Sequence, residues 1–164
     1  MAASTVIKNM NDGSVTVEDG TGSPVSLSVP FTVGDVSIDG LGPQQNEVTA
    51  YETRGSLNTV RHTTRTYPTV SFSAQIADYS DGTDGTLVDF CLFQASYSAN
   101  VSTLGANADV KTIKLTLTVE GTDHGDSADH TIVMDDVYVT VAVAEGDPNT
   151  VTISGTIYGS VVMT

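Results

Sequence analysis

The chain has 164 residues, and its 20 acidic residues outnumber its 6 lysines and arginines, giving a formal net charge of −14. Binding to nucleic acids or to anionic membranes depends on lysine and arginine side chains that meet phosphate groups, so this charge argues against both. An acidic excess arises either from the function of a protein or from adaptation to high salt, and charge alone does not separate these two causes. The length fits a single β domain over residues 1–164, with a core that needs no metal or disulfide.

The composition predicts a β protein. The 24 Thr, 22 Val and 7 Ile residues make up about a third of the chain, and their branched side chains suit a pleated sheet better than a helix. Cys91 is the single cysteine of the sequence and lies in an apolar stretch, so we expect a buried, unreactive thiol. Residues 1–13 lack the apolar segment of a signal peptide, and no stretch approaches the length of a membrane span. We therefore expect the protein to be made in the cytoplasm.

Apolar residues alternate with polar ones along several segments. The clearest segments are 25–33, 70–76, 113–119, 137–143 and 151–153, and shorter candidates lie at 14–18, 47–53 and 57–64. A period of two is typical of antiparallel strands with one buried face. Pro30 cannot donate a backbone hydrogen bond, which predicts that its strand lies at a sheet edge or is broken there. Residues 34–46 and 121–130 are expected to be loops.

One segment, residues 86–97, is dense in apolar side chains that do not alternate. Thr86 and Asp89 have the spacing of a capping box, so we predict a single, largely buried helix that packs across one end of the strands. A buried strand is the alternative for this segment. The fold predicted for the whole chain is all-β: a two-sheet sandwich or open barrel of about eight strands, with one short helix at about residues 86–97.

Charge is distributed unevenly along the sequence. Residues 115–164 contain eight acids and no lysine or arginine, whereas Arg54, Arg61 and Arg65 fall within twelve residues that contain no acid. A monomer gains little from this asymmetry, but a protein that binds copies of itself gains orientation when a basic patch meets an acidic one. The alternative is a solvated pair of strands on which the charges fall by chance.

The sequence contains little that points to catalysis. The Gly-x-Ser-x-Gly motif and phosphate-binding glycine loops are absent, and Cys91 lacks the electropositive surroundings of a reactive thiolate. Asp123, Asp126 and Asp129 lie beside two histidines and are weak candidates for a metal site, although the spacing of a calcium loop is not met. Neighbouring residues on a strand point to opposite faces, so the pair Asp135–Asp136, expected at a bulge or turn, is not read as catalytic. We predict no enzyme activity and no cofactor.

Two segments in the middle of the chain carry a family resemblance. Residues 52–61, ETRGSLNTVR, and residues 67–73, YPTVSFS, resemble the central part of the major tail tube proteins of long-tailed, siphovirus-like bacteriophages. In that family a glycine-containing turn and an arginine-containing strand lead into a strand of this kind and then into a helix. The order of the predicted elements is similar over the whole chain.

The resemblance implies a sandwich of two sheets plus a helix, six copies of which close into a ring. Such rings stack into a hollow tube that conducts DNA during ejection, without specific DNA binding and without a membrane. The implied partners are copies of the chain itself and other tail proteins, namely the tape measure, terminator and distal tail proteins. The protein would reside in the tail of the virion after assembly in the host cytoplasm.

The resemblance to tail tube proteins also suggests roles for individual residues. Arg54, Arg61 and Arg65 are expected at contacts with a neighbouring subunit or ring. A tube lumen lined with carboxylates offers DNA no cation to hold it, so acids of the C-terminal strands are candidates to face the lumen, namely Glu120, Asp135, Asp136 and Glu145.

Other functions stay open at this point. A capsid decoration protein or a ring-forming tail terminator is another kind of virion assembly protein with the same acidic β character. A β-sandwich module that binds calcium or carbohydrate belongs to a different class. A hydrolase is the weakest alternative, because no nucleophile, base and orienting group can be named.

Overall fold

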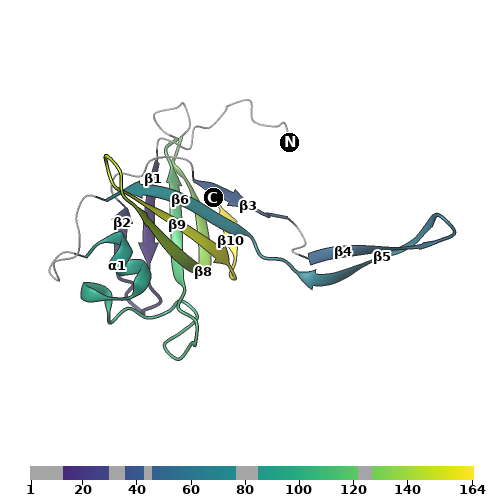
Figure 1. Cartoon of the computed structure of the whole chain (residues 1–164), viewed down its shortest axis with the longest axis horizontal. Coiled ribbons are helices and arrows are strands. Elements are labelled where there is room, and N and C mark those ends of the chain that lie inside the picture. The colour runs from purple at the N-terminus through teal and green to yellow at the C-terminus, as the bar shows by residue number, and fades with distance from the viewer. Residues whose placement is uncertain (1–12, 30–35, 43–45, 77–84, 122–126) are drawn as a thin grey trace.

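The computed structural model describes residues 13–29, 36–42, 46–76, 85–121 and 127–164. Within these ranges the chain is mostly β, with one short α-helix, as predicted (Figure 1). In chain order the elements are β1 (Gly13–Glu18), β2 (Ser26–Val29), β3 (Ser37–Asp39), β4 (Asn46–Thr53), β5 (Ser56–Arg65), β6 (Thr69–Gln75), α1 (Leu87–Leu92), a 3-10 turn (Ala95–Tyr97), β7 (Ile113–Val119), β8 (His130–Ala144), β9 (Thr150–Ile157) and β10 (Val161–Met163).

Eight strands form one antiparallel sheet, in the order β2-β1-β7-β8-β9-β6-β3 with β10 paired to β8. The edge position predicted for the strand that precedes Pro30 is confirmed by β2, while Pro30 itself lies outside the described residues. Strands β4 and β5 form a separate two-stranded sheet that projects from this body (Figure 1). No helix in the described ranges has the length and apolar character needed to cross a membrane.

Strand β8 connects two parts of the large sheet because it bends in its middle. Its first half pairs with β7 and β10, and its second half pairs with β9. The bend lies at Asp135–Asp136, where Asp136 has a φ of 52° and the register with β7 shifts. Bulges of this kind re-aim a strand and allow one sheet to fold over itself. In Figure 1, β6 and β9 accordingly cross the direction of β1 and β7.

The alternating pattern decides which side chains form the core. In β7 every second residue from Ile113 to Val119 is at most 5% exposed, and the residues between them are half-buried. The inward-facing residues of β1, β6 and β9 join the same cluster, together with Phe90 of α1, which is fully buried. Helix α1 packs against β2 and β8, so it covers one end of the strands as the sequence predicted.

The helix is shorter than the predicted range 86–97. The capping box forms as expected, because the Asp89 N–H donates to the Thr86 hydroxyl while the Asp89 carboxylate accepts from the Thr86 N–H. The helix nevertheless stops at Phe93, which adopts the left-handed conformation with a φ of 53°. The chain then continues as the 3-10 turn. Cys91 is buried in α1, and burial raises the pKa of its thiol to about 12, consistent with an unreactive thiol.

Two short strands were not predicted. Strand β3 lies inside the segment expected to be the loop 34–46, and β10 lies beyond the last predicted strand. Strand β8 also begins at His130, earlier than the predicted 137–143, because the polar residues at its start and the Asp135–Asp136 bend interrupt the alternation. The predicted loop 121–130 is described only at its two ends.

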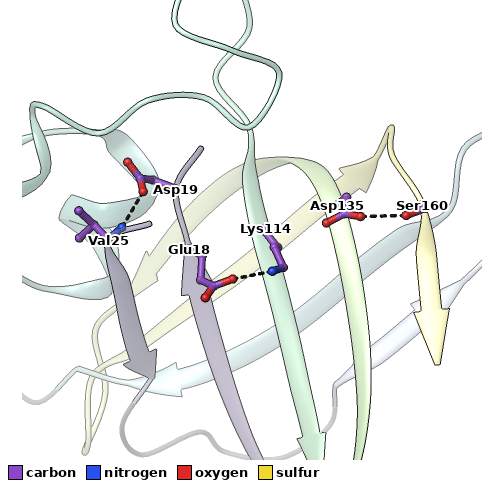
Figure 2. A network of polar contacts seen from close by, with 6 residues as sticks. All are labelled: Glu18, Asp19, Val25, Lys114, Asp135 and Ser160. Carbon is purple, nitrogen blue, oxygen red and sulfur yellow. Dashed lines mark hydrogen bonds and ion pairs between the residues drawn. The ribbon is translucent and has the colours of Figure 1, made fainter. Parts of the chain in front are cut away.

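Asp19 ties the connection between β1 and β2 to a distant loop. Its carboxylate accepts a hydrogen bond from the Val25 N–H at 2.7 Å (Figure 2). It also accepts from the Val101 N–H at 3.1 Å and the Thr21 hydroxyl at 2.9 Å, and the residue is 3% exposed. Burial by itself raises the pKa of this carboxyl, but the hydrogen bonds outweigh burial and leave the pKa below the usual 3.8. The ionised form of Asp19 therefore stabilises the fold.

Replacing Asp19 with Asn is expected to lower the free energy of unfolding by about 1–3 kcal/mol at pH 7, since buried N–H groups lose a charged acceptor. Because the folded-state pKa is depressed, the contribution is present above the unfolded-state value of about 3.9 and is lost as the pH falls through the folded-state value. Urea unfolding of the wild-type and Asp19→Asn proteins at pH 7 and pH 3 measures the difference in their free energies of unfolding. Glu47→Gln, at an exposed acid, serves as the control. If Asp19→Asn lowered the free energy of unfolding equally at both pH values, the ionised carboxylate of Asp19 would not be what stabilises the fold.

Candidate assembly surface

The most unusual feature of the molecule is the β4–β5 hairpin, residues 46–65, which we call the projecting hairpin. It extends away from the body on the side opposite α1 (Figure 1). Every residue from Glu47 to Arg65 is exposed, and none belongs to the core cluster. Isolated two-stranded hairpins are marginally stable at best in water. A hairpin of this length without a body to pack on is expected to pack on another molecule.

The sequence explains why the hairpin forms. Thr53 pairs directly with Ser56, which leaves Arg54 and Gly55 as a two-residue turn. Both residues have positive φ, 50° and 80°, as a type I′ turn requires. Glycine reaches this conformation without strain, and the turn places the Arg54 side chain at the tip of the hairpin.

The hairpin exposes large apolar side chains. Val48 is 61% exposed, Tyr51 50%, Leu57 64% and Val60 51%. Val60 lies directly across from Ala50, and His62 from Val48, so one face of the hairpin gathers Val48, Ala50 and Val60. Scattered single apolar residues on a surface are ordinary, but a contiguous set on a projecting element marks an interaction site.

The hairpin also concentrates positive charge. Residues 46–65 hold three of the six lysines and arginines and two of the twenty acids, a net charge of +1, so the rest of the chain carries −15 to make the total of −14. Arg54 lies at the tip and Arg61 on β5 across from Thr49. The structure thus brings the three arginines predicted at an interface onto one projecting element, and their contact with a neighbour stays a prediction.

Arg65 differs from the other two because it lies at the base of the hairpin. Its guanidinium group sits 4.8 Å from the centre of the Tyr67 ring, and that ring meets Tyr158 edge to face at 4.8 Å. Arg65 therefore contacts the body where the hairpin leaves it, whereas Arg54 and Arg61 are exposed farther along the hairpin.

The four acids predicted to face a lumen do not gather in one place. Glu120 follows β7, Glu145 is exposed in the connection between β8 and β9, and Asp135 and Asp136 occupy the bend in β8. The two aspartates have different partners: Asp135 accepts from the Ser160 hydroxyl at 2.8 Å (Figure 2), and Asp136 accepts from the Thr103 hydroxyl at 2.7 Å. Both thus stabilise the bend, and a role facing a lumen stays a prediction for all four.

The candidate metal ligands do not form a cluster among the described residues. No group of three His, Cys, Asp or Glu side chains gathers within the part of the chain that the structure describes. Of the weak metal candidates, Asp123 and Asp126 lie outside that part, and Asp129 is exposed and accepts a hydrogen bond from the Gly121 N–H at 3.1 Å. The ion pair of Lys114 with Glu18, at 2.8 Å, joins β7 to β1 within the large sheet (Figure 2).

The sequence pointed to the arginines of this surface but not to its apolar residues. The sequence around the apolar residues is that of two ordinary strands, and it does not indicate that the body leaves them exposed. These residues are Val48, Tyr51, Leu57 and Val60. The feature of the sequence that indicated this surface was the run of twelve residues without an acid, which spans the turn and β5.

No family model matches the chain, and no curated protein matches it in sequence. Among solved structures, a chain from the sheath/tube terminator of an extracellular contractile injection system, PVC, in its extended state is similar with a TM-score of 0.59 and 14% identity, over 99% of both chains. A chain from the six-fold symmetrised baseplate of the anti-feeding prophage is similar with a TM-score of 0.51 and 11% identity, over 100% of this chain and 97% of that one.

These likenesses extend over essentially the full length of both chains, so they concern the complete arrangement of strands and not a shared fragment. At 11–14% identity they establish the architecture alone. The chain described here has a fold that also occurs in the terminator and baseplate structures of phage-tail-like injection systems.

Proposed function

We propose that this chain is a non-enzymatic structural subunit of a phage-tail-like assembly, which joins copies of itself into a ring that ends the tube as a terminator. The observation that carries the proposal is the projecting hairpin, which exposes its apolar residues and half of the chain's lysines and arginines away from the body. A surface of this kind is costly in a monomer and useful in an assembly.

The place at the end of a tube is supported by the full-length likeness to a chain of a sheath/tube terminator structure. A second candidate is the major subunit of the tube itself. It is favoured by the hairpin sequence 52–61 and the strand that follows at 67–73, which resemble tail tube proteins, and by the hairpin reaching beyond the body, as stacking contacts require. In either place DNA would pass without being held, because the net charge of −14 repels it.

Negative-stain electron microscopy of the purified chain separates the two candidates. A terminator is expected to form single closed rings that do not stack, whereas a tube subunit is expected to form open-ended polymers. Particles that remain single compact molecules at every concentration would contradict both.

Charge reversal on the projecting hairpin is expected to abolish assembly. The variant Arg54→Glu with Arg61→Glu changes the charge of the hairpin from +1 to −3, so two acidic surfaces meet where a basic and an acidic one met before. Both side chains are exposed, so the free energy of unfolding is expected to change by less than about 0.5 kcal/mol. Sedimentation velocity and urea unfolding measure the two effects.

The matched control is Arg54→Lys with Arg61→Lys, which keeps both charges at the same positions. It is expected to assemble, with at most weaker contacts, because lysine lacks the planar group of arginine. Normal assembly of the glutamate variant would remove the two arginines from the interface.

A further inference from the structure

The outer face of three strands in the large sheet carries rows of hydroxyl groups. Strand β9 lies between β6 and β8, and its side chains that point away from the core stand opposite those of both neighbours. Thr69 pairs with Thr156, and Ser71 pairs with Ser154, which in turn pairs with Thr140 on β8. These five residues, which we call the hydroxyl rows, line a depression of about 330 Å³. None of the described residues that line it is charged.

Two tyrosines continue this face toward the loop before β7. Tyr138 pairs with Thr156 on the ladder of β8 and β9, and Tyr158 comes directly after the end of β9. Tyr138 lines the depression over the hydroxyl rows and also a second depression of about 700 Å³, which Tyr158 lines too. The two tyrosines are 43% and 41% exposed. The two depressions thus form one groove, which we call the tyrosine groove, and their volumes lie in the range of about 300–1,000 Å³ that is typical of ligand sites.

The tyrosine groove is held in place by the sheet and by contacts among aromatic residues. The Tyr158 N–H donates to the carbonyl oxygen of Asp136 at 3.1 Å, which ties the corner after β9 to β8. The Tyr158 ring also meets the Tyr67 ring edge to face, with their centres 4.8 Å apart. The hydroxyl rows lie on paired strands, whose ladders fix the spacing between them. A surface that is already formed loses little conformational entropy when a ligand binds.

The polar groups of the tyrosine groove are available to a ligand. Within the hydroxyl rows, Thr140 donates to the Ser154 carbonyl oxygen at 3.1 Å, while the hydroxyls of the other four residues meet no partner among the described residues. Each hydroxyl can donate one hydrogen bond and accept two. Of the described residues that line the groove only Asp109 and Lys111 are charged, and their charges cancel. The groove is therefore neutral, although the chain has a net charge of −14.

A neutral carbohydrate chain has the chemistry that this groove recognises. Sugar hydroxyls donate and accept hydrogen bonds as the groove hydroxyls do, and the C–H face of a sugar ring packs on an aromatic ring. An anionic ligand would meet a protein of net charge −14 in a groove without an excess of positive charge. An apolar peptide would bury the hydroxyls without hydrogen-bond partners, which costs free energy.

We propose that the tyrosine groove binds neutral polysaccharide, with a sugar ring packed on Tyr138 and Tyr158 and the neighbouring sugar hydroxyls bonded to the hydroxyl rows. This activity is separate from the proposed assembly, because no residue of the projecting hairpin lines the groove. A single site of this open kind binds weakly. A particle that presents many copies of the groove would hold a glycan-covered surface through their number.

A glycan array that carries neutral and acidic oligosaccharides tests the class of ligand, and calorimetric titration with the neutral oligosaccharide that binds most strongly measures the affinity. The wild-type chain is expected to bind neutral glycans and not acidic ones. Tyr138→Ala is expected to weaken binding about ten-fold because the packed ring is lost, whereas Tyr138→Phe keeps the ring and most of the affinity. The matched control is Leu92→Ala on α1, at an apolar residue that is 51% exposed outside the groove and whose loss leaves binding unchanged.

The double variant Thr69→Val with Thr156→Val distinguishes sugar binding from apolar docking. Valine keeps the branched shape and suits a strand, so the fold is retained, but two facing hydroxyls are removed. A sugar site is expected to lose affinity about ten-fold, because sugar hydroxyls lose their partners, whereas an apolar docking surface would gain affinity. Binding to acidic glycans alone, binding to no neutral glycan, or unchanged affinity in the valine variant would overturn the proposal. None of these results bears on self-assembly, which sedimentation velocity measures separately.

Discussion

A chain in which residues 47–64 are replaced by Asn-Gly is expected to stay folded and to lose self-assembly completely. Asn46 and Arg65 pair directly across the base of the projecting hairpin, so a two-residue turn of the I′ type can join them without moving either strand. Arg65 and its contact with Tyr67 remain. The deletion removes two acids and two arginines, so the net charge stays at −14 and solubility is not altered by charge.

The stability of this variant follows from the burial pattern. No residue of the hairpin belongs to the core cluster, so the free energy of unfolding is expected to change by less than about 1 kcal/mol. Circular dichroism during urea unfolding and light scattering at rising concentration give the two readouts. A variant that unfolds at a much lower urea concentration would mean that the hairpin stabilises the body, and one that still assembles would mean that other surfaces hold the copies together.

Replacing Phe90 with Ala is expected to lower the free energy of unfolding strongly. Phe90 is fully buried, and its ring meets Tyr97 edge to face at 4.8 Å, so it holds α1 and the turn that follows against the strands. Truncations of this kind cost about 3–5 kcal/mol, a large part of the total stability of about 5–15 kcal/mol that is typical of a domain. The shift of the urea unfolding midpoint at constant slope measures the loss.

Leu92→Ala on the same helix is the matched control, because Leu92 is 51% exposed. It is expected to change the free energy of unfolding by less than about 0.5 kcal/mol. A loss below about 1 kcal/mol for Phe90→Ala would show that α1 does not seal the core. Phe90 belongs to α1, which lies on the side of the body opposite the projecting hairpin in Figure 1, so folded protein of this variant is expected to assemble as the wild type does.

The strands with the cleanest alternation were the easiest to predict from the sequence. The predicted segment 113–119 coincides with β7, since each of its apolar residues fills the core. The three-residue strands β3 and β10 were missed because so short a segment carries no measurable period. The length of α1 was wrong because the left-handed conformation of Phe93 depends on packing and not on a glycine that the sequence would reveal.

The candidate site was predictable only in part, for a related reason. The two hairpin strands and the arginines could be found from alternation and charge, but alternation says that a face is buried without saying which molecule buries it.

Whether copies of this chain bind one another is measured most directly by sedimentation velocity of the wild-type protein over a range of concentrations at low and high salt. We expect the mass to rise well above the 17.1 kDa of one chain as the concentration increases, and high salt to weaken this association. A single species of one chain's mass at every concentration and salt would contradict it.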